Sequence, residues 1–157
     1  MPQTPTLELG RPAPDFALPR DGGGTVALGD LRGRHVVLYF YPRDDTPGCT
    51  TEALAFSTLL PEFERRGATV LGVSRDPVAS HDRFRRKHDL AVALLSDEDG
   101  AVCERYGVWV EKTMYGRTSM GVERATVLVA PDGSVLRVWR KVKVAGHAEA
   151  VLEAIPE

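Results

Sequence analysis

The stretch "HVVLYFYPRDDTPGCTTEALAFSTLL" (35–60) joins an apolar run to a segment with helical spacing through a short link that contains two prolines and a cysteine. Its first part (35–41) is β-branched and aromatic, which is typical of a strand buried on both faces of a sheet. Its last part repeats apolar residues at helical spacing, and Pro47 suits a helix start. The stretch therefore predicts a strand, a tight loop and a helix with Cys49 in its first turn.

The rest of the chain continues this alternation of strand and helix. Pro61 is expected to kink or break the first helix, which Gly67 ends. A proline-rich lead-in (Pro2, Pro5, Pro12, Pro14) and a glycine turn precede a short strand at 25–28. The later expected elements are strands at 69–74 and 91–96, helices at 76–90 and 97–107, an extended loop at 108–123, a hairpin at 125–139 around a Pro-Asp-Gly turn, and a helix at 146–155.

This order of elements predicts a mixed α/β sheet covered on both faces. It is the order of the thioredoxin fold, with an N-terminal extension and additions in the middle. We find no repeat and no long linker, so one domain over 1–157 is expected. A Rossmann fold would need a glycine-rich turn after the first buried strand, and the phosphate-loop signature is also missing.

Composition narrows the classes of function. A formal net charge of −2 and a pI near 6.1 give no reason to expect nucleic acid or membrane as a partner, and the basic run at 83–88 is interpreted as a solvated helix face. No secretory signal and no membrane-spanning run is expected. Two cysteines in 157 residues do not suggest a disulfide scaffold, so a reducing, cytoplasmic setting is expected. The four histidines lack ligand spacing, and no metal site is predicted.

The position of Cys49 favours a reactive thiol. The first amides of a helix have no helical partner and the helix dipole is positive there, so an anion such as a thiolate is stabilised. Cysteines at such sites, or beside cations, have pKa values lowered from about 8.5 to roughly 3.5–7.5. Asp44 and Asp45 would oppose a thiolate, so we expect them to point to solvent or to cap the helix. A buried, inert cysteine at a tight turn is the alternative interpretation.

The spacing of Pro42, Thr46 and Cys49, Pro-x-x-x-Thr-x-x-Cys, resembles the peroxidatic-cysteine motif of the peroxiredoxins. The longer string "YFYPRDDTPGCTTEA", followed in order by "GVS", "LLSDEDG", "YGVW", "EKTMYGRT" and "GVERATVLV", is similar to the bacterioferritin-comigratory-protein, or peroxiredoxin Q, branch. The resemblance extends over roughly residues 8–155, and it implies a thioredoxin fold with peroxiredoxin-type insertions.

The resemblance also implies roles for five residues. Cys49 is the thiolate that attacks a hydroperoxide and becomes a sulfenic acid. Thr46 offers a hydroxyl to the peroxide and the sulfur, and Pro42 shields the pocket from water. Arg124 supplies a permanent cation, and Glu52 orients that arginine.

Taken singly, three of these residues have plainer interpretations. Thr46 also fits an N-terminal cap, and Glu52 a first-turn carboxylate favoured by the helix dipole. Arg124 also fits a surface charge at a strand edge. Only the joint pattern favours the catalytic interpretation.

The second cysteine departs from the pattern that the resemblance implies. Many members carry a resolving cysteine five residues after the peroxidatic one, where this chain has Leu54, or in the following helix, which here has none. Cys103 is the remaining candidate, and a disulfide needs the two Cα atoms within about 7 Å. The alternative is that Cys103 packs as a small apolar residue between Val102 and Tyr106. We therefore expect a one-cysteine cycle, with the two-cysteine cycle left open.

The function that the resemblance implies is a thiol-dependent peroxidase without cofactor or metal. Its expected partners are hydrogen peroxide or organic hydroperoxides and a thioredoxin-like or small-molecule thiol. A monomer is expected, and a dimer stays open. Other hypotheses are a peroxide sensor or interaction module that uses the same cysteine, and a holdase. A disulfide reductase would need Cys-x-x-Cys, whereas residues 49–52 read "CTTE".

Overall fold

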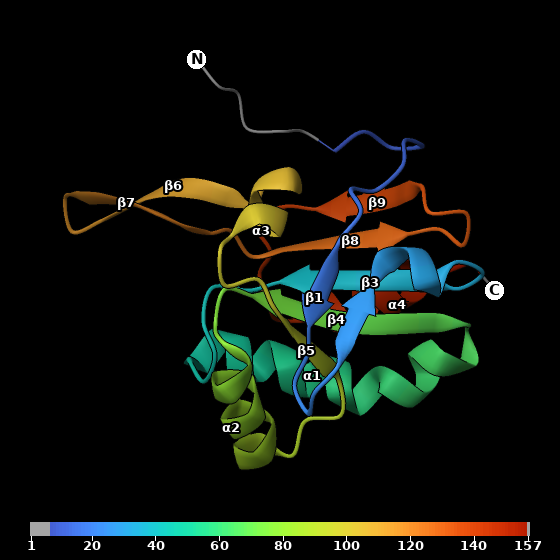
Figure 1. Ribbon diagram of the computed structural model, residues 1–157, viewed down its shortest axis with the longest axis horizontal. Helices are drawn as coiled ribbons and strands as arrows, with labels where there is room; N and C mark the ends of the chain where they lie inside the picture. Colours follow the sequence, from blue (N-terminus) through green and yellow to red (C-terminus); the bar gives the residue numbers. More distant parts are fainter. Residues whose placement is uncertain (1–6, 157) are drawn as a thin grey trace.

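A five-stranded mixed sheet forms the centre of the molecule (Figure 1). The computed structural model describes residues 7–156, so the predicted lead-in positions Pro2 and Pro5 lie outside the described residues. In spatial order the strands are β5 (Ala93–Ser96), β4 (Ala68–Ser74), β3 (His35–Phe40), β8 (Ala125–Val129) and β9 (Val135–Trp139). Strand β3 pairs with β4 in parallel and with β8 antiparallel, which confirms the thioredoxin-fold prediction.

Alternate residues of β3 point into two separate cores. Val36, Leu38 and Phe40 join the core on one face, whereas Val37 and Tyr39 join the core on the other face. All five side chains are almost completely buried. The continuous apolar run thus results from a strand covered on both sides.

Different elements cover the two faces of the sheet. One face packs against α1 (Pro47–Arg65), α2 (Val78–His88) and α4 (His147–Ala154). The other face packs against the small hairpin of β1 (Ala17–Pro19) and β2 (Thr25–Ala27), the 3-10 turn η1 (Leu28–Leu31), and α3 (Ala101–Arg105). Strand β1, between the expected lead-in and the glycine turn, was not predicted.

Helix α1 continues through Pro61, so of the expected kink or break the break is wrong. Proline costs the helix one hydrogen bond, and Pro61 lies on the exposed side of the helix. Phe56 and Phe63, on either side of it, are completely buried in the same core. Their shared packing outweighs the local preference of proline, because tertiary contacts supply most helix stability in proteins.

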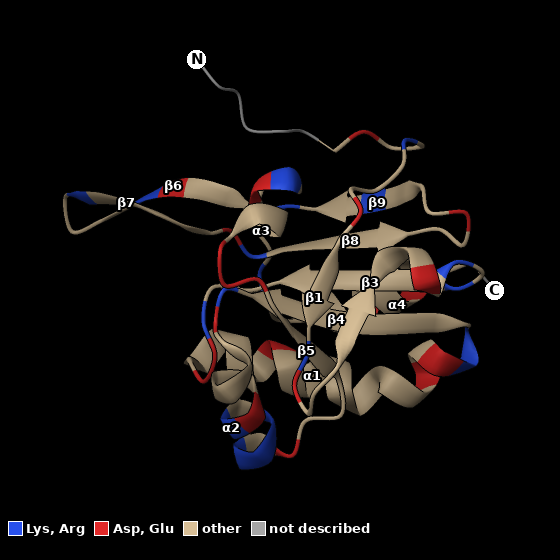
Figure 2. Ribbon diagram, viewed as in Figure 1, with Lys and Arg blue, Asp and Glu red and all other residues tan. Residues whose placement is uncertain are grey.

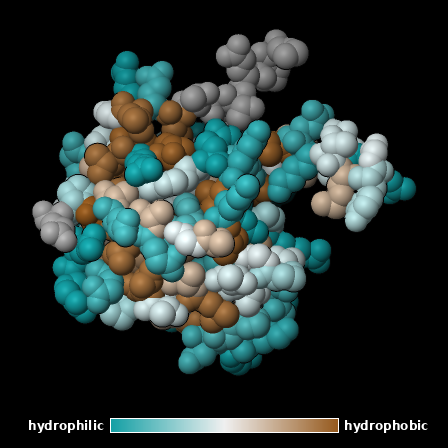
Figure 3. All heavy atoms as spheres, turned by 180° about the vertical axis from the view of Figure 1, so that it is seen from behind, coloured by the Kyte–Doolittle hydropathy of each residue, from teal (hydrophilic) through white to brown (hydrophobic). Residues whose placement is uncertain are grey.

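The segment 108–123 contains a hairpin and is not the extended loop that the sequence suggested. Strands β6 (Trp109–Met114) and β7 (Arg117–Val122) pair around Tyr115-Gly116, which both have positive φ, as in a type I′ turn. The hairpin projects from the body (Figures 1 and 3). Its outer part is mostly exposed on both faces, so no alternation of apolar and polar residues revealed it.

The basic run of the sequence lies on α2, where charged residues of both signs occur (Figure 2). Arg83, Arg86 and Lys87 are exposed, whereas His81 and Phe84 are buried. The basic residues thus line the outer side of an amphipathic helix, as expected. Within residues 7–156, no helix is long and apolar enough to cross a membrane.

Candidate active site

Cys49 occupies the third position of α1, as the sequence predicted. Thr46 is the N-cap residue with extended backbone, and Pro47 is the first helical residue. The amides of a first helical turn have no acceptor within the helix, and the dipole there is positive. The Cys49 side chain is 1% exposed, so its sulfur lies in a place that favours negative charge and excludes most solvent.

Arg124 reaches Cys49 because the sheet brings two distant segments together. Ala125, the first residue of β8, is paired with Phe40, the last residue of β3. Arg124 immediately precedes β8 and therefore lies beside the loop that leads to Cys49. Its Nη2 donates a hydrogen bond to Sγ of Cys49 at 3.4 Å. A permanent cation thus contacts the sulfur.

Glu52 holds the other nitrogen of the same guanidinium. Nη1 of Arg124 donates to Oε1 of Glu52 at 2.7 Å, one turn of α1 after Cys49. Glu52 is 1% exposed, and its Oε2 has no hydrogen-bond partner among the described residues. Burial raises the pKa of Glu52 to about 7, although Arg124 opposes the shift. Burial alone would lower the pKa of Arg124, but Glu52 and Cys49 raise it above its usual value. The predicted trio therefore forms one connected unit.

Gly48 has a specific role that the sequence did not reveal. A Cβ atom at this position would lie 3.1 Å from Nη2 of Arg124, closer than most real Cβ contacts. The missing side chain therefore gives the guanidinium room to reach Cys49. Nothing in a Pro-Gly-Cys string shows which distant side chain needs that space.

Thr46 and Pro42 belong to the loop that leads from β3 to α1. The Thr46 hydroxyl donates to the carbonyl of Arg43 at 2.9 Å, and its side chain makes no capping hydrogen bond. The oxygen keeps its lone pairs for a further donor. Both Thr46 and Pro42 are half-buried. The plain N-cap interpretation of the Thr46 side chain is not supported, and the catalytic roles of both residues stay predictions.

The two aspartates of the loop behave differently from each other. Asp45 is exposed and is bonded to Lys87 and His88 of α2, which lower its pKa. Asp44 is buried and accepts hydrogen bonds from Tyr41 and from residues of α2. The expectation that both would point to solvent or cap the helix is therefore wrong for Asp44, because partners from α2 satisfy its carboxylate inside the protein.

Two more titratable groups lie near enough to Arg124 for its charge to affect them. Lys112 of β6 donates to the carbonyl of Val122, and burial followed by the charge of Arg124 lowers its pKa. His147 of α4 lies 2.7 Å from the hydroxyl of Thr126 through Nε2. Burial and Arg124 lower the pKa of His147 to about 4, so its ring is neutral at neutral pH. The surroundings of Cys49 therefore carry positive charge on Arg124 and Lys112.

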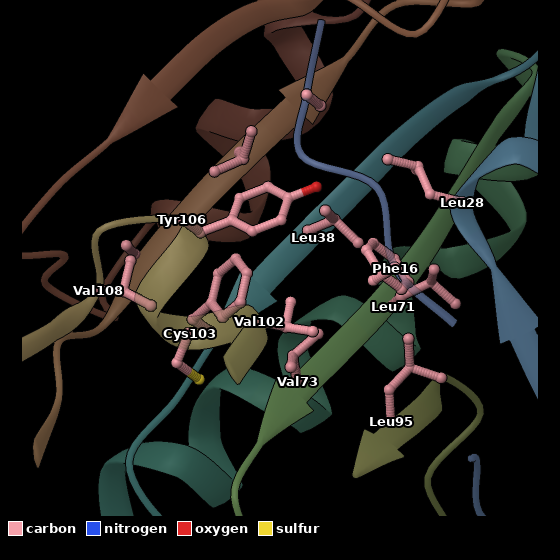
Figure 4. Close-up of a cluster of buried hydrophobic side chains, with 14 of the residues drawn as sticks. Phe16, Leu28, Leu38, Leu71, Val73, Leu95, Val102, Cys103, Tyr106 and Val108 are labelled. Carbon is pink, nitrogen blue, oxygen red and sulfur yellow. The ribbon is translucent and has the colours of Figure 1, made fainter. Parts of the chain in front are cut away.

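Cys103 lies on the opposite face of the sheet from Cys49. It belongs to the core that contains Val102 and Tyr106 (Figure 4), whereas Cys49 belongs to the core under α1. Cys103 is completely buried, and its amide donates to Asp97 at 2.8 Å. Burial, with Asp97 nearby, raises the pKa of the Cys103 thiol. This agrees with Cys103 as a packed core residue.

The site suits nucleophilic attack by sulfur. It combines a thiol at a helix N-terminus, a guanidinium that contacts the sulfur, and a carboxylate that fixes the guanidinium. Such donors stabilise both the thiolate and the negative charge that develops on a leaving oxygen. Within residues 7–156, no group of three His, Cys, Asp or Glu side chains is arranged to hold a metal ion.

Comparisons with known proteins agree with this geometry. A family model described as the AhpC/TSA family matches residues 9–138. Peroxiredoxin Bcp of Xanthomonas campestris is 52% identical over 149 residues, which cover 95% of this chain and 93% of that protein. Peroxiredoxin Bcp of Bacillus subtilis is 42% identical over 152 residues, which cover 97% of this chain and 97% of that protein.

Solved structures give the same result. The bacterioferritin comigratory protein of Xanthomonas campestris matches with a TM-score of 0.88 and 52% identity over 95% of both chains. Peroxidoxin BcpB of Mycobacterium tuberculosis matches with a TM-score of 0.83 and 34% identity, covering 95% of this chain and 96% of that one. The chain therefore belongs to the AhpC/TSA family and, within it, to the bacterioferritin-comigratory-protein, or peroxiredoxin Q, branch of thiol-dependent peroxidases.

Proposed function

We propose that this peroxiredoxin reduces hydrogen peroxide and organic hydroperoxides through a cycle in which Cys49 is the only cysteine that reacts. The Cys49 thiolate attacks the terminal peroxide oxygen, so an S–O bond forms as the O–O bond breaks. The bonding pair leaves with the alkoxide or hydroxide, which takes up a proton and departs as alcohol or water. Cys49 is then a sulfenic acid.

The neighbouring residues support this step in different ways. Arg124 stabilises the thiolate and the charge that develops on the leaving oxygen, and Glu52 fixes the direction of the guanidinium. The Thr46 hydroxyl oxygen accepts a hydrogen bond from the O–H of the peroxide, and Pro42 limits access of water. One related protein, the bacterioferritin comigratory protein of Xanthomonas campestris, is described as having alkyl peroxide reduction activity, which supports organic hydroperoxides as substrates here.

An external thiol completes the cycle. It attacks the sulfur of the sulfenic acid, releases water and leaves a mixed disulfide, which a second thiol resolves to regenerate the Cys49 thiol. The two thiols are thereby oxidised to a disulfide by two electrons, which matches the two-electron reduction of the peroxide. A thioredoxin-like protein or a small-molecule thiol fits this role.

The observation that carries the one-cysteine cycle is the separation of the two sulfurs by the sheet. Cys49 and Cys103 lie in cores on opposite faces, and a disulfide needs their Cα atoms within about 7 Å. To meet, one of them would have to leave a core in which it is at most 1% exposed. The usual positions of a resolving cysteine, position 54 and helix α2, contain no cysteine in this chain.

A peroxide-consumption assay with recycling thiol tests the proposal. The wild type and Cys103→Ala should turn over many times, and Cys49→Ser should be inactive. Loss of turnover in a folded Cys103→Ala variant would contradict the one-cysteine cycle. A single turnover in the wild type, with either a dithiol or a thioredoxin system, would instead indicate a sensor.

The proposal also includes the cellular compartment and the oligomeric state of the protein. Both cysteines are free and buried, which suits a reducing compartment, so we place the protein in the cytoplasm. We also assign it a monomeric state, which light scattering of the purified protein tests. A stable dimer at micromolar concentration would contradict that assignment.

A further inference from the structure

A buried ion pair joins the loop before Cys49 to helix α2. Asp44 in the loop is 8% exposed and His81 of α2 is 0% exposed. Nδ1 of His81 lies 2.7 Å from Oδ2 of Asp44, and Nε2 of His81 lies 2.9 Å from the carbonyl oxygen of Leu95 in β5. Both ring nitrogens therefore face oxygen atoms at hydrogen-bond distance.

The geometry determines where the protons are. The carbonyl of Leu95 can only accept, so Nε2 of His81 carries a hydrogen. Asp44 also receives hydrogen bonds from the hydroxyls of Tyr41 at 2.6 Å and Ser80 at 2.8 Å, so its two oxygens act as acceptors. Its Oδ2 faces Nδ1 of His81 as well. His81 is thus an imidazolium with both nitrogens donating.

The same loop has a second attachment to α2 at the surface. Asp45 is bonded to Lys87 at 2.7 Å and His88 at 2.8 Å, and all three groups are at least partly exposed. A cleft of about 400 Å³, whose lining includes Asp44, Asp45 and Lys87, lies between the loop and the helix. Exposed ion pairs contribute little, whereas breaking a buried pair is strongly unfavourable. The inner pair therefore dominates the attachment.

The attachment lies close to the reactive sulfur along the chain. Asp44 is five residues before Cys49, and Asp45 between them has a left-handed backbone with φ of 57°. Thr46, the next residue, is the N-cap of α1. Fixing Asp44 thus fixes the start of the turn that carries the sulfur. Because Cys49 is 1% exposed, an external thiol can reach its oxidised sulfur only when this turn opens.

We propose that His81 is a positioning residue for the reaction of Cys49: as an imidazolium it clamps Asp44 to α2 and β5, holds the loop closed for peroxide reduction, and sets how often the loop opens to the reducing thiol. Only the last effect, the opening of the loop to an external thiol, rests on the proposed one-cysteine cycle. The clamp itself is a property of the resting protein. It has opposite effects on the two half-reactions.

The clamp weakens as pH rises. The groups that face His81 are Asp44 from the loop, Tyr41 from the end of β3, Asp76 after β4 and the Leu95 carbonyl of β5. Burial opposes the charge on His81, but Asp44, the Leu95 carbonyl and Asp76 raise its pKa above 6.5. Its stabilisation is therefore complete below pH 6.5 and is lost as pH rises through the raised pKa.

Amide hydrogen exchange of residues 43–49, except Pro47, which has no amide hydrogen, tests the clamp without peroxide or thiol. His81→Gln should speed exchange of these amides by at least roughly tenfold, since a hydrogen bond between charged groups is lost. The matched control His88→Gln removes the surface contact of the same loop with Asp45, together with an edge-on contact of the ring with Phe84, and should change exchange by less than about threefold. In the wild type, the protection factors of these amides, corrected for the intrinsic rise of exchange with pH, should fall between pH 6.5 and the raised pKa of His81. In His81→Gln the protection factors should not change over this range.

Single-turnover kinetics then separate the two half-reactions. His81→Gln should slow oxidation of Cys49 by peroxide and speed reduction of the sulfenic acid by a small thiol, while His88→Gln leaves both unchanged. Unchanged loop exchange in His81→Gln, or an equal increase throughout β3 and β4, would overturn the clamp. If His81→Gln does not fold, Asp44→Asn replaces it, because it removes the charge that His81 contacts and keeps the shape of the side chain; a localised increase at 43–49 supports the clamp, whereas no increase overturns it.

Discussion

Replacement of Arg124 by glutamine tests the electrostatic part of the site most quantitatively. The change removes the cation that lies 3.4 Å from Sγ of Cys49 and 2.7 Å from Glu52. It should lower kcat/KM for hydrogen peroxide and leave the fold intact. Glu52 would lose its partner, but burial already raises its pKa to about 7, so it can become neutral.

The size of the effect follows from the contact. Two unit charges at 3.4 Å attract by about 5 kcal/mol at an effective dielectric constant near 20, an upper value for this pair. Hydrogen bonds to charged groups contribute about 1.5–3 kcal/mol in proteins. Taking about 2–3 kcal/mol as the loss, kcat/KM should fall by roughly 30- to 150-fold. Arg124→Lys keeps the charge but loses the planar fork that reaches both partners, so a smaller loss of roughly tenfold is expected.

Stopped-flow measurement of peroxide consumption at fixed thiol, with circular dichroism of each variant, measures this directly. The expected order of activity is wild type, then Arg124→Lys, then Arg124→Gln. A folded Arg124→Gln variant with kcat/KM within about threefold of the wild type would refute the assigned role of the guanidinium.

Three further changes test neighbouring features. Gly48→Ala should cut kcat/KM by roughly tenfold because its methyl group displaces Arg124, while the melting temperature is retained; unchanged kcat/KM would contradict this. In the wild type, the raised pKa of Glu52 should make the free energy of unfolding fall as pH rises from 4.5 through about 7. Glu52→Gln keeps an acceptor for Arg124 and should abolish this fall, which urea unfolding at several pH values measures. The same dependence on pH in both proteins would argue against it. Leu54→Cys, on the 41% exposed Leu54, should let peroxide treatment form a disulfide to Cys49, visible by non-reducing peptide mapping; its absence would show that the first turns of α1 do not open.

The strands and helices that pack on the central sheet could be predicted from the sequence, because burial on one or two faces leaves a period in the chain. The hairpin at 109–122 could not, since most of it contacts solvent on both faces and so has no apolar period. Pro61 misled for a different reason. The local preference of a proline shows in the sequence, but the packing of Phe56 and Phe63 that overrides it does not.

For the site, the resemblance to a family brought Cys49, Glu52 and Arg124 together before any geometry was available. What it could not supply were interactions of residues that have no assigned role in the family motif. Asp44 looks like a loop residue until His81, 37 residues later, is seen beside it. The Asp-Asp pair after β3 thus contains one surface residue and one buried residue that composition alone does not distinguish.

Mass spectrometry of the peroxide-treated protein, trapped with dimedone, tests the central claim most directly. The site predicts a dimedone adduct of a sulfenic acid on Cys49, with Cys103 unmodified in the folded protein. A main product in which Cys49 and Cys103 are joined by a disulfide, or an adduct on Cys103 alone, would contradict the account.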